Sequence, residues 1–142
     1  MGANSVKMLT IEGKALALKT LKAVKELFVD NNRWCTGTDA KTSSGLNISP
    51  CDPRATSFDV VGGVKAVTGK DHAAFTVTVL LLFSVLPPEI RKEPGGQPVL
   101  ADSSVQAEHR LQEWNDGVAR DFAEVHDLID RAIAEAQQGD LF

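Results

Sequence analysis

Residues 121–136 read DFAEVHDLIDRAIAEA, and this stretch carries the clearest helical pattern in the chain. Its apolar residues recur at spacings of three and four, so one side of an α-helix is apolar while the other is acidic. Asp121, with Glu124 three residues later, has the form of a capping box and predicts where the helix starts. The apolar stripe, which must face a core, comprises Phe122, Val125, Ile129, Ala132, Ile133 and Ala136.

Three other stretches extend this helical pattern. Residues 14–31 place their apolar side chains on one broad arc, with Lys14, Lys22 and Lys25 on its flank, and this predicts an amphipathic helix. Residues 75–83, FTVTVLLLF, are ambiguous because β-branched residues favour a strand, but their length and lack of breakers favour a buried helix. Ser103 and Gln106 form a second capping box, which predicts a helix reaching about Asp116.

A helix is also predicted from Pro53 to Thr68, stopped by Gly69. Asp52 can accept hydrogen bonds from the free N–H groups of a first turn, and proline is well tolerated at the first helical position. The pair Gly62-Gly63 inside this helix costs about 1 kcal/mol each relative to alanine. We therefore expect another backbone to approach closely there.

The fold class that follows is mainly α, a single domain of four to five helices spanning residues 1–137. Residues 33–49 are polar and predict a short hairpin or an irregular insertion, with Ser43-Ser44-Gly45 as a turn between residues 34–36 and 46–48. Residues 138–142 follow as a separate docking tail. No internal repeat or long heptad pattern is present.

The composition excludes several classes of protein. A formal charge of −4 and a pI near 5.3 make direct nucleic-acid contact unexpected, although a local basic patch stays open. No signal peptide or run of about 20 apolar residues is visible, so we expect a cytoplasmic protein with no membrane contact. Cys35 and Cys51 are then free thiols. The scattered histidines and cysteines predict no metal and no cofactor.

The last five residues, Gln138-Gly139-Asp140-Leu141-Phe142, place two large apolar side chains at the end of a polar segment. Water exposure brings such side chains no gain, so we expect them to be buried on something. The pattern of Gln, any residue, Asp, Leu and Phe resembles the pentapeptide by which bacterial polymerases and their accessory proteins bind the DNA sliding clamp.

That resemblance implies a role for each residue and a partner, the bacterial sliding clamp. Gln138 is the polar anchor, Asp140 a spacer, and Leu141 with Phe142 the hydrophobic anchors. The hypothesis is a non-enzymatic interaction protein, carried by a phage or mobile element, that modulates replication or repair. The alternative is that Leu141 and Phe142 fold back and cap the core beside the last helix.

Two aromatic-polar clusters lie in the body, Trp34-Cys35-Thr36-Gly37 and Trp114-Asn115-Asp116. They resemble the motifs of an uncharacterised family of small bacterial and phage proteins, in which a second cysteine is expected where this chain has Asp59. Asn115 and Asp116 most simply cap a helix end, and Cys35 is most simply a structural cysteine. The alternative function is a small enzyme or ligand-binding domain, with a site formed by Trp34, Cys35, Asp59, Trp114, Asn115 and Asp116.

Overall fold

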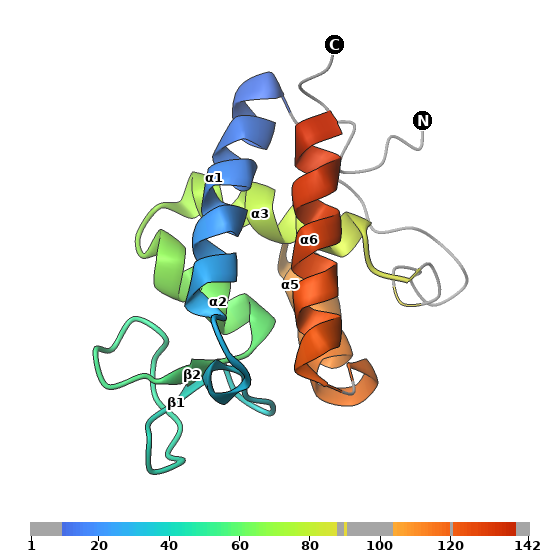
Figure 1. The fold of residues 1–142 in the computed structure, drawn as a ribbon. Helices are drawn as coiled ribbons and strands as arrows, with labels where there is room; N and C mark the ends of the chain where they lie inside the picture. The colour runs from blue at the N-terminus through green and yellow to red at the C-terminus, as the bar shows by residue number, and fades with distance from the viewer. Residues whose placement is uncertain (1–9, 88–89, 91–103, 120, 139–142) are drawn as a thin grey trace.

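A computed structural model gives the fold (Figure 1) and describes residues 10–87, 90, 104–119 and 121–138. This part of the chain forms a mainly helical body with one small two-stranded sheet, as the sequence predicts. A 3₁₀ turn covers Asn31–Arg33, and a π-helical turn covers Trp114–Val118. The helices are α1 (Ile11–Leu27), α2 (Val60–Thr68), α3 (His72–Ser84), α5 (Ser104–Glu113) and α6 (Phe122–Gln138), and the strands are β1 (Ala40–Lys41) and β2 (Ser57–Phe58).

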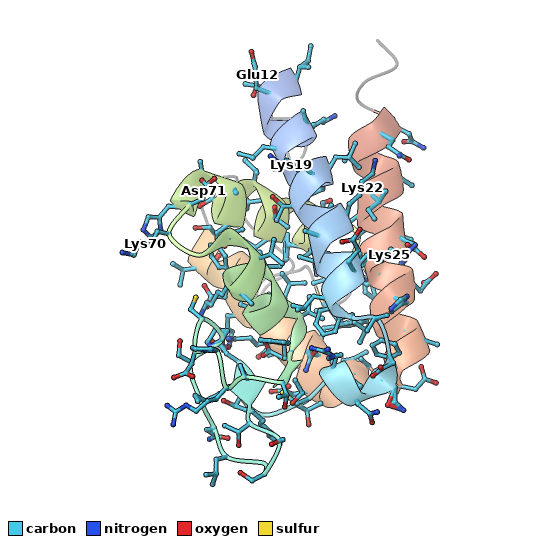
Figure 2. All side chains as sticks on the ribbon, turned by 60° about the vertical axis from the view of Figure 1, so that its left-hand side comes forward. Glu12, Lys19, Lys22, Lys25, Lys70 and Asp71 are labelled. Atoms are coloured by element: carbon cyan, nitrogen blue, oxygen red, sulfur yellow. The ribbon has the colours of Figure 1, made fainter. Side chains whose placement is uncertain are left out.

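Helices α1 and α6 lie side by side and run antiparallel, so the start of α1 and the end of α6 share one end of the molecule (Figure 1). Figure 2 labels Lys19, Lys22 and Lys25 along α1, and Lys25 Nζ pairs with Asp130 Oδ1 of α6 at 2.8 Å. Both helices were predicted, and α1 ends before residue 31 because Phe28 leaves the helical region. Their facing residues are fully buried: Ala17, Leu21 and Val24 from α1, and Val125, Ile129, Ala132 and Ala136 from α6.

Helix α3 packs against α1, α2, α5 and α6, which confirms the prediction of a buried helix over residues 75–83. The tertiary setting decides against a strand, because a helix that is apolar on all sides is stable only where neighbours surround it. Asp71 begins α3 by accepting a hydrogen bond from Ala74 N at 3.1 Å. None of the helices in the described ranges has the length and hydropathy that a membrane span needs.

The predicted helix start at Pro53 is wrong, since α2 begins at Val60. Asp52 does accept a hydrogen bond from Arg54 N, but it closes only a turn. Residues 57 and 58 are then held extended by pairing with β1. The N-cap of α2 is Asp59, whose Oδ1 accepts a hydrogen bond from Gly62 N at 2.5 Å.

The insertion is built differently from the predicted hairpin. The turn at Ser43-Ser44-Gly45 is present, with Gly45 N donating to Thr42 O at 2.9 Å. Residues 46–48, which follow the turn, pair with residues 40–42. The sequence predicted that residues 34–36 would be the strand that pairs with residues 46–48. Instead, Cys35 N donates to Phe58 O at 3.0 Å, which ties this segment to β2.

Helix α5 continues into the π-helical turn, so helical backbone reaches Val118 rather than ending near Asp116. The Asp121 cap is confirmed, because Asp121 Oδ1 accepts a hydrogen bond from Glu124 N at 3.1 Å. Ser103 of the other predicted capping box lies outside the described residues, as do residues 139–142 of the predicted tail.

The expected close approach at Gly62 is present. A Cβ at this position would lie 1.8 Å from Asp39 O, a backbone atom that also accepts a hydrogen bond from Asp59 N. A Cβ on Gly63 would lie 2.7 Å from the Phe28 ring. Only glycine allows α2 to approach the loop before β1 so closely.

We predict that Gly62→Ala lowers the free energy of unfolding by about 3 kcal/mol, because the Asp39 carbonyl must move and the hydrogen bond to Asp59 N must stretch. Gly117→Ala is the matched control, since a Cβ there has open space within 4 Å and the change is expected to stay within about 0.5 kcal/mol. Urea denaturation of both variants measures the difference. Equal stabilities would show that the close approach is unimportant.

Candidate functional site

The side chain of Asn115 is fully buried and joins three segments that are distant in sequence. Its Oδ1 accepts hydrogen bonds from Trp34 Nε1 at 2.8 Å and from Val60 N at 3.1 Å. Its Nδ2 donates to Cys35 O at 3.1 Å and to Asp116 Oδ1 at 2.9 Å. The amide thus makes two hydrogen bonds as an acceptor and two as a donor, which uses its full capacity.

The π-helical turn Trp114–Val118 is what presents Asn115 to the interior. Ala119 N donates to Trp114 O at 2.7 Å, so the turn holds one residue more than an α-helical turn. Trp114 is 3% exposed and belongs to the hydrophobic core. The indole of Trp114 therefore anchors the turn, and the next residue forms the polar junction.

Asp116 extends the junction to the loop after Trp34. Its Oδ1 accepts a hydrogen bond from Gly37 N at 3.0 Å, and Gly37 has φ +83°, a backbone conformation that favours glycine. The interpretation of Asn115 and Asp116 as caps of their own helix is wrong. Asn115 instead satisfies Val60 N, a free donor at the start of α2, and Asp116 fixes the loop.

Asp59 lies beside this junction and is 2% exposed. Burial raises the pKa of its carboxyl to about 7, the nearby charges of Asp39 and Asp116 act in the same direction, and the hydrogen bond from Gly62 N acts against it. Near neutral pH this buried carboxyl therefore exchanges a proton. Its oxygen still caps α2, so the same residue combines a structural role with an unusual titration.

Cys35 is buried, and its Sγ lies 3.8 Å from Thr38 O. Burial raises the pKa of its thiol, against the hydrogen bond from Ser57, while nearby Asp59 raises it further. A thiol with a raised pKa carries little thiolate, which is the reactive form. This is the environment of a structural cysteine. As the sequence predicts, Cys35 and Cys51 are both free.

Three of the six residues of the predicted ligand site, Trp34, Cys35 and Asp116, hydrogen-bond to a fourth, Asn115, but the six do not line one hollow. Trp34 and Cys35 line a groove of about 860 Å³ beside the sheet, which we call the Trp34 groove. Asp116 lines a separate hollow of about 560 Å³ with His109 and Gln112. Trp114 lines a third hollow of about 290 Å³ with Val118 and Arg131, whereas Asp59 and Asn115 are buried.

A second groove, of about 720 Å³, was missed by the sequence analysis; it is lined by Cys51, His72 and Lys65. Lys65 Nζ pairs with Asp39 Oδ2 at 2.9 Å and with Glu108 Oε2 at 3.2 Å. Burial works to lower the pKa of Lys65, but these partners outweigh it and the pKa is raised. One signal could have found this site: Lys65 is the single charged residue of α2.

Across the described ranges, no group of three or more His, Cys, Asp or Glu side chains is placed to hold a metal ion. The polar residues at the centre of the molecule bond to one another and to backbone groups instead. The arrangement defines a helical domain whose interior junction holds two residues, Trp34 and Cys35, that line the Trp34 groove.

A family model described as a family of unknown function, DUF6197, matches residues 14–135. The chain belongs to this family, which confirms the expected membership of an uncharacterised family. The matched range contains the whole Asn115 junction and stops before Gln138. No curated protein and no solved structure matches the chain.

We predict that Asn115→Asp destabilises the fold by about 3 kcal/mol or more. The new oxygen cannot donate to Cys35 O, and it places a carboxylate against Asp116 Oδ1. Asn47→Asp is the matched control, because Asn47 is exposed and its change is expected to cost less than about 0.5 kcal/mol. Chemical denaturation at pH 7 compares them. Similar losses at both positions would contradict the role given to the junction.

The titration of Asp59 predicts a pH dependence of stability. Its pKa is about 7 in the folded protein and near 3.8 in the unfolded chain. Between these two pH values, the folded state therefore holds a proton that the unfolded state has lost. Stability should therefore rise as pH falls from about 7 towards 5, by up to about 1.4 kcal/mol per pH unit.

Asp59→Asn keeps the capping oxygen and removes this titration. Its free energy of unfolding, measured from pH 8 to pH 5, should change less with pH than that of the unaltered protein. Asp52, whose hydrogen bonds with Arg54 lower its pKa to about 2, stays ionised throughout this range. Parallel pH profiles of the two proteins would rule out a protonated Asp59.

Proposed function

We propose that this protein binds the bacterial DNA sliding clamp through Gln138, Asp140, Leu141 and Phe142 and so modulates replication or repair. The observation that carries the proposal is the sequence of residues 138–142, which has the polar and apolar residues of clamp-binding peptides at matching positions. Such a role suits a small protein carried by a phage or mobile element, which must act on a host machine through few contacts.

The end of α6 supports the proposal. Ala136 is fully buried, whereas Gln137 and Gln138 are exposed, so the last core contact of the helix precedes the peptide. Gln138, the predicted first residue of the tail, is the last residue of α6. The helix itself is held by its packing on α1. A peptide that continues from this helix starts from a fixed point on the surface.

The energetics allow an interaction of modest strength. Burying two side chains of the size of Leu141 and Phe142 contributes about 3–6 kcal/mol. Ordering the peptide and losing free motion offset part of this gain, so the peptide alone should bind with a Kd of about 1 μM or weaker. Tighter binding by the full chain would require further contacts from the helical body.

We predict that a chain ending at Gln137 loses binding to purified clamp, measured by surface plasmon resonance against the full chain. Gln138→Ala and Phe142→Ala should each weaken binding at least about tenfold, since each removes one anchor. Gln137→Ala is the matched control, because this neighbouring exposed glutamine lies outside the pentapeptide. Equal binding by the full and shortened chains, or no binding by either, would refute the proposal.

A further inference from the structure

The Trp34 groove lies at the end of the molecule that carries β1 and β2, opposite the end where α6 finishes (Figure 1). Its volume of about 860 Å³ is within the range of small-molecule sites, about 300–1,000 Å³. Much of its lining consists of hydroxyl groups, which can act as donors or acceptors towards a polar ligand. These belong to Thr36, Thr42, Ser43, Thr56 and Ser57, of which Thr42 already accepts a hydrogen bond from Leu46 N at 3.2 Å and Thr56 donates to Lys41 O at 3.4 Å.

The charges of the groove are positive in a chain that is acidic overall. Arg33 and Lys41 both line it, and among the described residues neither has an ion-pair partner. The one acidic residue of the lining, Asp30, already accepts a hydrogen bond from Asn32 N at 2.9 Å. The groove thus holds two cations against one carboxylate, and a negatively charged ligand could pair with both.

The groove around Lys65 shows the contrast. There the ammonium group already contacts two carboxylates, Asp39 and Glu108, so the protein satisfies its own cation. Arg33 and Lys41 lack such partners. Arginine and lysine side chains left with open donors beside several hydroxyl groups are the usual means of holding a phosphate.

The Trp34 groove also offers a fixed aromatic ring. Trp34 is partly exposed, and the hydrogen bond from its Nε1 to Asn115 Oδ1 holds the indole in one orientation. An aromatic face that is fixed in advance can stack on a flat ring with little loss of side-chain freedom. The same groove therefore combines a place for an anion with a place for a ring.

We propose that the Trp34 groove binds a free nucleotide, with its phosphate on Arg33 and Lys41 and its base against Trp34. The hydroxyl groups of Thr36 and Ser43 complete the polar lining. This activity goes beyond clamp binding, and the groove lies beside β1 and β2, at the end of the α1 and α6 pair opposite to the end of α6 (Figure 1). A substitution can therefore remove nucleotide binding without removing clamp binding.

The test is a titration of the full chain with the four common 5′-nucleoside monophosphates, their nucleosides and inorganic phosphate, followed by tryptophan fluorescence. We expect at least one nucleotide to bind with a Kd below about 1 mM, and more tightly than its nucleoside or phosphate alone. Arg33→Gln and Lys41→Gln should each weaken nucleotide binding about tenfold and leave the weak binding of the nucleoside unchanged.

Lys70→Gln is the matched control, because Lys70 is exposed at the turn between α2 and α3, away from the groove (Figure 2). Its affinity should equal that of the unaltered chain, and thermal unfolding checks that every variant is folded. A chain ending at Gln137 should keep its nucleotide affinity, which separates this result from the clamp experiment. The proposal would be overturned if a nucleotide and its nucleoside bound with the same Kd, or if no nucleotide bound with a Kd below about 1 mM. An equal loss of nucleotide affinity in Lys70→Gln would also overturn it.

Discussion

The structure depends on one buried amide. Asn115 binds an indole N–H, the first free N–H of α2, the carbonyl of Cys35 and the carboxylate of Asp116, and these groups come from three separate segments. Val60 N and Cys35 O are buried, and each would cost about 1–3 kcal/mol if left without a partner. An amide is the side chain that can satisfy them together, because it offers two acceptor and two donor positions on one flat group.

The Asn115 junction gives the polar residues of the two motifs a structural role. Trp34, Cys35 and Asp116 look like members of an active site when read along the chain, yet each is tied to the Asn115 junction or buried beside it. The raised pKa of Cys35 argues against a nucleophile, and the oxygen of Asp59 is used as a helix cap. Their common effect is to hold the irregular insertion against the helices, and this fixes the walls of the Trp34 groove.

The helical pair α1 and α6 separates the two surfaces to which we assign partners. The end of α6 leads into the pentapeptide, while the groove lies beside β1 and β2 at the other end (Figure 1). The family match covers the junction and the groove but not residues 138–142. The body and the peptide can thus serve different partners, one by shape and charge and the other by two apolar side chains.

The sequence determined α1 and α6, because their apolar spacing and the Asp121 cap of α6 act within a few residues of the chain, whereas residues 75–83 of α3 allowed either a helix or a strand until packing surrounded them. It also predicted the close approach at Gly62, since a glycine pair inside a helix needs a reason, and it identified the two motifs that meet at Asn115. Tertiary structure alone decided the start of α2, which β1 sets by holding residues 57 and 58 extended. It also decided what Asn115 binds and which cations stay unpaired in the Trp34 groove, since these depend on groups that meet only when segments distant along the chain pack together.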